Sequence, residues 1–320
     1  MKAAVVSRYE APPSYGEFDD PVAGEGEVLV EVSAAGFHRI VKALASGSHY
    51  GSTGVLPMIP GVDGVGRLTD GTRVYFGKVR EPYGTMAERC VTTRRMCMEV
   101  PESMDDATIA GMMNPGMSSW AALKERAQFR TGESVLIVGA TGIAGQLAVQ
   151  IARRLGARRV AAAGRNEAAL KELEQLGADA VIPLGKDRES VVSALRAEIK
   201  EHQTDVVLDY VWGAPAEMVL EAIGEKGLSH ASWRIRYLQI GNSAGPTITL
   251  PAATMRSTGL ELMGSGFGSV SMERIFASLA EFLKEAAREP FESKEKSVPL
   301  SEVESMWNAP DGGERLVFRP

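Results

Sequence analysis

The sequence predicts a two-domain α/β protein in which an antiparallel β domain precedes a doubly wound parallel sheet. Its 320 residues suit two domains at the usual size of about 150 residues each. Before residue 115, short β-type segments alternate with glycines and prolines, as in compact antiparallel domains. From residue 134 onwards, strand and helix patterns alternate six times, which is typical of a parallel sheet covered by helices on both faces.

The predicted first domain spans residues 1–115 and consists mainly of strands. Apolar and β-branched residues gather in five segments that glycine or proline separates. These segments are MKAAVV, GEVLVEVSAAGF, GVGRL, TRVYFG and YGTMAERCVT. A helix-like stretch at 39–46 interrupts them, and helical patterning follows at 105–110 and at 118–128.

A glycine-rich turn at 139–145 marks a nucleotide-binding unit. The apolar strand 135–138 enters this turn, an amphipathic helix follows, and a second strand occupies 159–163. Glycine permits the sharp turn and lets the backbone approach a pyrophosphate, which the N–H groups at the helix start can bind. The strand–turn–helix–strand context makes this a strong signal of a Rossmann fold. The residues expected at the pyrophosphate are Thr141, Gly142, Ile143, Ala144 and Gly145.

The end of the second strand indicates which dinucleotide binds. NAD-specific folds place Asp or Glu there, to bind the ribose 2′-hydroxyl. This chain has Gly164, Arg165 and Asn166 instead, and its first acid is Glu167. An arginine fork binds a phosphate at two points and with full charge. We therefore expect NADP(H), with Arg165 on the 2′-phosphate and Lys171 as a weaker candidate; the alternative for Arg165 is a solvated loop charge.

The next predicted elements complete the second domain, and the chain then leaves that domain in a return segment. Further strands are expected at 180–183, 206–210, 235–241 and 260–264, and helices at 167–176, 188–201 and 214–223. The second domain is thus expected to span 116–268. A long helix at 271–287 and a β pair around helix-like residues 301–307 form a return segment, 269–320, which would complete the first domain.

Composition and charge exclude several classes of function. A net charge of −6 gives no electrostatic support for nucleic-acid binding. The two cysteines, Cys90 and Cys97, make neither a disulfide framework nor a cysteine-rich zinc cluster. The first residues lack the apolar core of a signal peptide, and no run reaches the roughly 18 apolar residues of a membrane span. We expect a cytoplasmic protein that acts on a small-molecule substrate.

The order of these parts resembles the medium-chain dehydrogenase/reductase superfamily over nearly the whole chain. In particular it resembles the zinc-independent quinone oxidoreductase branch, the zeta-crystallin-like proteins. The matching segments are MKAAVV, SAAGFHRIVKALASGSHY, VGATGIAG, DVVLDYVWG, IGNSAG and GERLVFRP. The resemblance implies a GroES-like fold for the first domain, a substrate site in a cleft between the domains, and a homodimer formed through the edge strand near 260–264.

The resemblance does not extend to a catalytic zinc. Zinc members of the superfamily bind the metal through a Cys, the His of a Gly-His-Glu motif, and a later Cys or Asp. The matching positions here are His38, Val62 and Asn114, of which only His38 is a good ligand. Because a catalytic zinc needs three protein ligands, and because the four-cysteine structural zinc loop is also absent, we expect no metal.

Without a metal, the cofactor supplies the chemistry and the protein orients it. Hydride transfer to a quinone or enone builds charge on oxygen, and a hydroxyl, an imidazole or water then supplies a proton. Tyr50 is the first candidate donor, followed by His49 and His38. The alternatives are a lid residue for Tyr50, an exposed loop position for His49, and a polar residue lining the cleft for His38. The branch usually has asparagine where His38 stands, and its pocket tyrosine falls on His49.

The resemblance also places residues beside the cofactor. Ser118 would contact its ribose or phosphate, with capping of a helix N-terminus by one of the two serines as the alternative. The turn after the fifth strand would hold the nicotinamide half, although a strand-ending turn alone explains its glycines. Its residues are Gly241, Asn242 and Ser243. Gly266 and Phe267 lie in a loop, 264–268, that could close over the ring as a lid or simply link the domains.

We therefore predict an NADPH-dependent, metal-free oxidoreductase that reduces a quinone or an activated C=C bond. Two alternatives stay open. One is a metal-free reductase of a C=O or 2-enoyl intermediate in a biosynthetic pathway. The other is a catalytically silent NADPH-binding protein, which would bind NADPH tightly without turnover on any acceptor.

Overall fold

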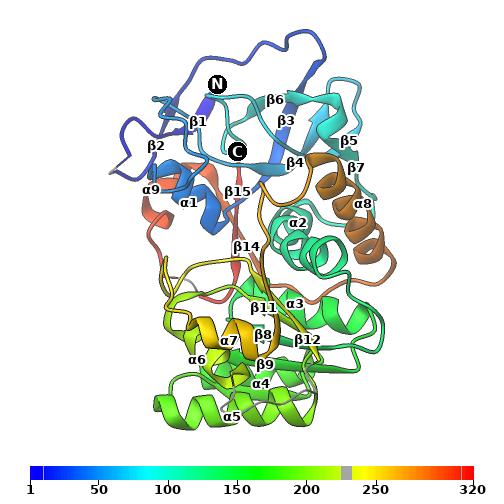
Figure 1. Ribbon diagram of the computed structural model, residues 1–320. Coiled ribbons are helices and arrows are strands. Elements are labelled where there is room, and N and C mark those ends of the chain that lie inside the picture. The colour runs from blue at the N-terminus through cyan, green and yellow to red at the C-terminus, as the bar shows by residue number, and fades with distance from the viewer. Residues whose placement is uncertain (10, 225–232, 311) are drawn as a thin grey trace. The chain divides into compact units, whose positions relative to one another are not determined.

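The computed structural model describes residues 1–9, 11–224, 233–310 and 312–320, which divide into two compact units (Figure 1). The first unit comprises residues 1–115 and 283–320, and the second comprises residues 116–282. One unit contains a mainly antiparallel sheet and the other a parallel sheet with helices, which confirms the predicted α/β class. We expected the return of the chain at residue 269, whereas the units divide inside helix α8 (Met272–Arg288).

The first turns of α8 pack on the second unit. The ring of Phe282 lies 5.7 Å from that of Trp120, centroid to centroid. It also covers Gly116, where any Cβ would clash with it. Ser278 donates a 3.2 Å hydrogen bond to Glu125. These contacts explain why the return begins later than the expected loop.

Most strand pairs of the first unit are antiparallel. Strand β1 (Lys2–Val5) pairs with β2 (Ser14–Glu17) in a small sheet. The larger sheet has the order β14–β15–β3–β4–β5–β7, and β6 also pairs with β3. Among the described strand pairs of this sheet, β14–β15 alone is parallel. Its strands are β3 (Glu27–Gly36), β4 (Asp63–Leu68), β5 (Arg73–Gly77), β6 (Arg89–Thr93), β7 (Cys97–Glu99), β14 (Glu295–Pro299) and β15 (Arg315–Arg319).

The return segment supplies both strands and core to the first unit. Strand β15 pairs with β3, with Phe318 opposite Ala35. The ring of Phe37 lies 5.5 Å from Phe318 and 4.8 Å from Trp307. The helical pieces are α1 (Arg39–Ala45), α9 (Val303–Met306) and the 3-10 turns Arg94–Met96 and Leu300–Glu302. Residues 269–320 were expected to complete this domain, and the part from 283 onwards lies in it.

Two local expectations for the first unit differ from the structure. The segment YGTMAERCVT contributes only its last residues to strand β6, because its first residues form irregular backbone with bends and a single bridge from Ala87 to Ala3. Strands β2 and β7 were not predicted, since four and three residues are too few to show a periodicity.

Helix α2 (Asp106–Ala121) is continuous, although two separate helices were expected. It contains Pro115, and a π-helical turn at Ala122–Arg126 extends it. Proline removes a helical hydrogen bond and usually kinks or ends a helix. Here Ile109, Met112 and Met113 are buried on the same helix, so tertiary packing outweighs the local preference.

The second unit is a six-stranded parallel sheet with the order β10–β9–β8–β11–β12–β13. Its strands are β8 (Ser134–Val138), β9 (Arg159–Gly164), β10 (Ala180–Pro183), β11 (Val206–Asp209), β12 (Arg234–Gln239) and β13 (Gly259–Gly264). Its other helices are α3 (Ile143–Arg154), α4 (Glu167–Gln175), α5 (Arg188–Glu201), α6 (Gly213–Ile223) and α7 (Ala252–Ser257). Every residue of β8 is buried, as expected for a strand covered on both faces.

The order in which the chain adds strands to the sheet reverses between the neighbouring strands β8 and β11. From β8 the chain moves outwards through β9 to β10, and from β11 it moves the other way through β12 to β13. Ligands of such sheets bind outside the carboxyl ends of the strands at this reversal. A ligand site is therefore expected at the loops that follow β8 and β11. Among the described residues, no helix is both long and apolar enough to cross a bilayer.

Candidate functional site

The turn after β8 needs glycine at two positions for packing. Gly139 has φ +85°, and a Cβ there would lie 2.7 Å from Val211 Cγ1. A Cβ on Gly145 would lie 2.5 Å from the carbonyl oxygen of Gly139. Gly142 is exposed, and a Cβ there would meet that oxygen only at an ordinary 3.6 Å. Gly142 thus leaves open space on the outer side of the turn.

Helix α3 begins at this open space without a side-chain cap. Its N-cap residue is Gly142, and no acidic residue lies in its first turn. Thr141, Ile143 and Ala144 are partly exposed. Helix N-termini present unpaired N–H groups and a partial positive charge. The backbone therefore fits a pyrophosphate, and Gly142 supplies the space that this group needs.

The end of β9 lies beside the same turn. Gly139 N–H donates a 2.9 Å hydrogen bond to the Ala163 carbonyl. A Cβ on Gly164 would lie 2.6 Å from Thr141 Cγ2, so this glycine is also needed for packing. The next residue, Arg165, is exposed and makes no hydrogen bond or ion pair with any residue that the structure describes.

Asn166 and Lys171 have other surroundings. The Oδ1 atom of Asn166 accepts a 3.2 Å hydrogen bond from Ala169 N–H and caps helix α4. Lys171 lies on α4 with its side chain exposed. Of Arg165, Asn166 and Lys171, only Arg165 is a cation that directly follows strand β9.

The loop after β11 forms the other side of the reversal, and sequence reasoning did not include it in the site. Asp209 Oδ1 accepts hydrogen bonds from Val211 N–H at 2.8 Å and Trp212 N–H at 3.0 Å. Its Oδ2 accepts one from the Tyr237 hydroxyl at 2.7 Å. Burial raises the pKa of Asp209, and these hydrogen bonds oppose the rise. Trp212 has φ 56° and ψ −155°, a strained conformation for a bulky residue, and such strain is concentrated at functional sites.

The predicted residues after β12 contact this loop. A Cβ on Gly241 would lie 2.5 Å from the Tyr210 carbonyl oxygen. Ser243 Oγ donates a 3.4 Å hydrogen bond to the same oxygen. Asn242 is exposed. The structure thus brings Gly241, Asn242 and Ser243 to the carboxyl edge of the sheet, beside the reversal.

Ser118 reaches the same loop from α2. Because it lies well inside that helix, the alternative that one of the two serines caps a helix N-terminus is wrong. The buried phenol of Tyr210 faces Ser118 and Ser119. Burial raises the pKa of Tyr210 to about 12, and the two serine hydroxyls oppose the rise.

Gly266 and Phe267 belong to a short closed turn after β13. Gly266 N–H donates a 2.8 Å hydrogen bond to Ser269 Oγ, and Ser269 N–H returns one of 3.0 Å to the Gly266 carbonyl. Phe267 is 40% exposed. No hydrogen bond that the structure describes links this turn to the loops after β8 and β11.

Two of the candidate proton donors lie in an exposed loop of the first unit. Tyr50 is 78% exposed, and its ring lies 4.1 Å from that of His49. His49 Nδ1 accepts a 3.0 Å hydrogen bond from Gly51 N–H. Partial burial lowers the pKa of His49, so its neutral form accepts this bond at neutral pH.

His38, the third candidate, is buried with an acid. It is 3% exposed, and its Nε2 lies 3.2 Å from Asp63 Oδ1. Tyr75 donates a 2.6 Å hydrogen bond to Asp63 Oδ2. Burial and the neighbouring Asp63 charge raise the pKa of Tyr75. Neither ring nitrogen of His38 makes a hydrogen bond with a described residue. Because the pair lies 25 positions apart in the sequence, no local pattern indicated Asp63.

No metal-binding cluster exists among the described side chains. No group of three or more His, Cys, Asp and Glu residues is arranged to hold an ion. The cysteines are also poor nucleophiles, because burial raises the pKa of Cys97 to about 11 and that of Cys90 further.

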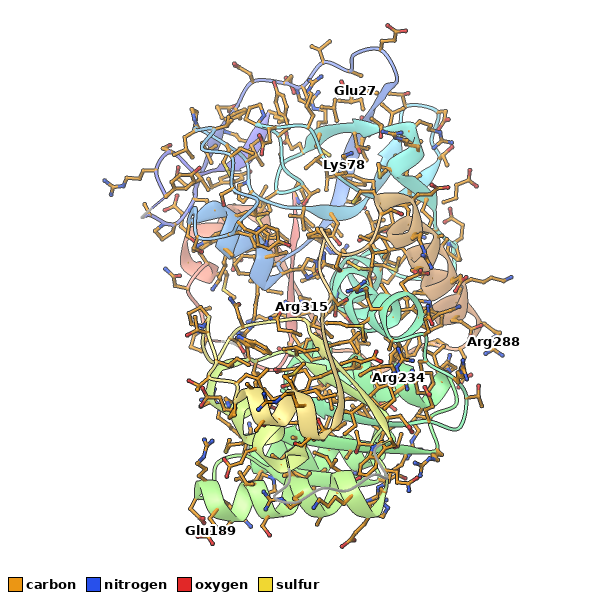
Figure 2. All side chains as sticks on the ribbon, in the orientation of Figure 1. Glu27, Lys78, Glu189, Arg234, Arg288 and Arg315 are labelled. Carbon is orange, nitrogen blue, oxygen red and sulfur yellow. The ribbon has the colours of Figure 1, made fainter. Side chains whose placement is uncertain are left out.

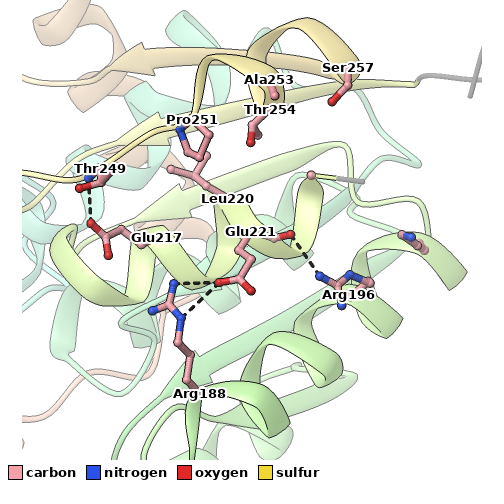
Figure 3. A pocket seen from close by; sticks show the side chains of 12 residues that line it. Arg188, Arg196, Glu217, Leu220, Glu221, Thr249, Pro251, Ala253, Thr254 and Ser257 are labelled. Carbon is pink, nitrogen blue, oxygen red and sulfur yellow. Dashed lines mark hydrogen bonds and ion pairs between the residues drawn. The ribbon is translucent and has the colours of Figure 1, made fainter. Parts of the chain in front are cut away.

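A hollow of about 970 Å³ lies on the second unit, between α5, α6 and α7. Its charged groups are paired: Arg188 lies 2.8 Å from Glu221, and Glu217 accepts a 2.8 Å hydrogen bond from Thr249 N–H (Figure 3). None of the predicted nucleotide-binding residues lines it. This hollow is therefore distinct from the candidate site.

Comparison with known proteins gives a family match and full-length relatives. The family model described as "Zinc-binding dehydrogenase" matches residues 144–285. A probable NADPH-dependent quinone reductase of Emericella nidulans is 30% identical over 364 aligned residues, covering 100% of both chains. A mycocerosic acid synthase-like polyketide synthase of Mycobacterium tuberculosis is 31% identical over 224 residues, which cover 66% of this chain and 10% of that protein. Among solved structures, the quinone oxidoreductase of Thermus thermophilus, also solved with NADPH, has a TM-score of 0.82 and 26% identity over the full length of both chains.

Proposed function

Because the chain belongs to the medium-chain dehydrogenase/reductase superfamily, in its quinone oxidoreductase-like branch, we propose that it reduces a quinone or an activated C=C bond with NADPH. It is an oxidoreductase that uses NADP(H). The observation that carries this proposal is the uncapped start of α3 at Gly142, with the unpaired Arg165 at the neighbouring strand end. The full-length likeness to a protein named as an NADPH-dependent quinone reductase supports the choice of acceptor.

The residues at the sheet reversal bind and orient the dinucleotide. The N–H groups of Ile143 and Ala144 bind the pyrophosphate, and Arg165 binds the 2′-phosphate. When bound, NADPH supplies the hydride. The loops after β11 and β12 hold the nicotinamide half of the cofactor, and Ser118 contacts a ribose or phosphate.

We propose that the proton comes from one of the three candidate residues, Tyr50, His49 and His38, or from water. Tyr50 remains the first candidate, because an exposed phenol on a glycine-flanked loop is free to approach a substrate. His38 has a buried acid beside it, because its Nε2 lies 3.2 Å from Asp63 Oδ1. A true donor contributes about 10²–10⁴ to the rate. Tyr50→Phe, His49→Gln and His38→Asn should therefore be compared for kcat, with NADPH affinity as the control.

A second function is reduction of a C=O or 2-enoyl intermediate in a biosynthetic pathway. The match to part of a mycocerosic acid synthase-like polyketide synthase favours it. An acceptor panel with quinones, enones and 2-enoyl thioesters separates the two functions. If all acceptors fail while NADPH binds, the protein is a silent binder.

We further propose a cytoplasmic homodimer that forms through β13. This strand is the edge of the parallel sheet. Its residue Glu261 pairs at 2.7 Å with Arg234 on β12, and both side chains are exposed; Figure 2 labels Arg234. Exposed strand edges offer unpaired backbone groups to a second copy. A monomeric mass in light scattering would contradict this arrangement.

The experiment that tests the function starts with nucleotide binding. NADPH and NADH are titrated into the wild type and into Arg165→Ala, with nucleotide fluorescence as the readout. We expect a preference for NADPH of about a hundredfold, or about 2.7 kcal/mol, that the variant loses. Equal binding of both nucleotides would contradict the site, and binding of neither would contradict the proposed function.

A further inference from the structure

The end of β10 runs beside the end of β9, which leads to Arg165. Leu184 N–H donates a 2.7 Å hydrogen bond to the Gly164 carbonyl, and Pro183 lies opposite Gly164 in the parallel register. A Cβ on Gly185 would lie 3.7 Å from the carbonyl oxygen of Arg165. The next residue is Lys186, so a second cation emerges from the loop that contacts Arg165.

No described residue neutralises this second cation. Lys186 is exposed, and like Arg165 it makes no hydrogen bond or ion pair within the part of the chain that the structure describes. Arg188, two residues later, is different, because it pairs with Glu221 at 2.8 Å. Arg165 and Lys186 thus lie in neighbouring loops, and neither charge is paired with a carboxylate among the described residues.

The nearby carboxylates serve the starts of the helices. Asp187 Oδ1 accepts a 2.9 Å hydrogen bond from Ser190 N–H, and its Oδ2 accepts one of 2.7 Å from Ser190 Oγ. These two bonds lower the pKa of Asp187. Glu167 lies in the first turn of α4, where a negative charge stabilises the helix. Glu189 points outwards from the first turn of α5 (Figure 2).

The two helix starts themselves are already capped. Asn166 caps α4 and Asp187 caps α5, so each helix has given an N–H group to a side chain. An anion at this edge of the sheet would therefore be bound by side-chain cations, not by a helix N-terminus.

We propose that Lys186 acts with Arg165 on the 2′-phosphate and is a specificity-determining residue for NADPH. This proposal rests on the proposed function. A phosphate monoester carries about −1.5 to −2 charges at pH 7, which one cation cannot balance. Arginine binds the phosphate as a fork and lysine adds a compact charge. NADH has a hydroxyl at that position, so Lys186 separates the two nucleotides.

Nucleotide binding tests this role without any turnover. The full chain is titrated with NADPH and NADH as wild type, Lys186→Ala, Lys186→Arg and Lys284→Ala. We expect Lys186→Ala to weaken NADPH about tenfold and NADH by less than about twofold. Lys186→Arg should keep the affinity for NADPH. Lys284→Ala is the matched control, because Lys284 is also exposed and makes no hydrogen bond or ion pair with a described residue but lies on α8; it should change neither affinity.

A double-mutant cycle tests whether the two cations share one phosphate. Arg165→Ala and Lys186→Ala should be non-additive for NADPH, because groups that bind one anion depend on each other. Competition by 2′-AMP should weaken in both variants, and competition by 5′-AMP should not change.

The outcomes separate this proposal from the proposed function. If the wild type prefers NADPH and loses that preference in Arg165→Ala but not in Lys186→Ala, the role of Lys186 is wrong and the function stands. Equal weakening of NADPH and NADH by Lys186→Ala also contradicts the role. A wild type without preference contradicts the assigned phosphate site.

Discussion

Tyr75 donates a 2.6 Å hydrogen bond to the carboxylate of Asp63, and both residues are buried in the first unit. The second oxygen of Asp63 lies 3.2 Å from His38 Nε2. A buried carboxylate is costly unless hydrogen bonds and opposite charge stabilise it. The Tyr75 hydroxyl therefore helps to keep Asp63 in place beside His38.

Removal of this hydroxyl should destabilise the fold. Tyr75→Phe leaves one buried oxygen of Asp63 without its donor, and we expect a loss of about 1–3 kcal/mol in the free energy of unfolding. Denaturant unfolding of the two proteins measures the difference. The control is Tyr83→Phe, because the Tyr83 hydroxyl has no hydrogen bond with a described residue; it should cost less than about 0.5 kcal/mol. Equal effects of the two changes would show that the bond contributes nothing specific.

The glycines of the nucleotide turn should respond differently to alanine. A Cβ on Gly145 would lie 2.5 Å from backbone atoms, so Gly145→Ala should destabilise the protein by about 1–3 kcal/mol. Gly142 has φ −77° and open space around it, so Gly142→Ala should fold normally. The variant should nevertheless bind NADPH more weakly than the wild type, because the added methyl group occupies space that the pyrophosphate needs. Thermal unfolding and NADPH titration of both variants measure this contrast. Wild-type affinity in Gly142→Ala would place the pyrophosphate elsewhere.

Stability should depend on pH through Asp209. Burial raises the folded-state pKa of this carboxyl above 3.8, so the folded protein binds the proton more tightly than the unfolded chain. The free energy of unfolding should therefore fall as pH rises from 3.8 through the raised folded pKa. Asp209→Asn cannot ionise and removes this contribution. The free energy of unfolding of both proteins is measured from acidic to neutral pH. As the pH rises, the wild type should lose stability relative to the variant. A gain relative to the variant would contradict the raised pKa of Asp209.

Cys97 should react slowly with alkylating reagents. Burial raises its pKa from 9.0 to about 11, and only the thiolate attacks. At pH 8 its thiolate fraction is about a hundredfold lower than that of an unperturbed thiol. Mass spectrometry after iodoacetamide treatment measures the rate, with Cys97→Ala to assign the modified site. Reaction at the rate of a free thiol would show that the side chain is not held in its buried position.

The second unit was largely predictable because its signals are local. Helix α5 begins and ends at the predicted residues 188 and 201, since an acidic cap and regular apolar spacing define it. The glycines of the nucleotide turn follow the same rule, because strand, turn and helix are consecutive. In each case the residues that cause the structure lie within a few positions of one another.

The features that escaped prediction depend on distant residues. Helix α2 continues through Pro115 because its buried side chains are packed by other elements. The loop after β11 joins the site because Gly139 and Gly241 contact it. Lys186 is near Arg165 only through the pairing of β10 with β9. These residues are neighbours because of the order of the strands in the sheet. That order cannot be read directly from a single sequence.

The pairing of β15 with β3 has a consequence for synthesis on the ribosome. Domains generally fold in order from the N-terminus as the chain emerges, at about 5–20 residues per second. The first unit cannot follow this order, because β3 acquires β15 as a neighbour only after residue 319 has been made. The second unit is continuous and is complete at residue 282. The portion of the protein that is translated first is thus the last to complete its native sheet, and the end of β3 at Ala35 and Gly36 lacks its β15 partner until then.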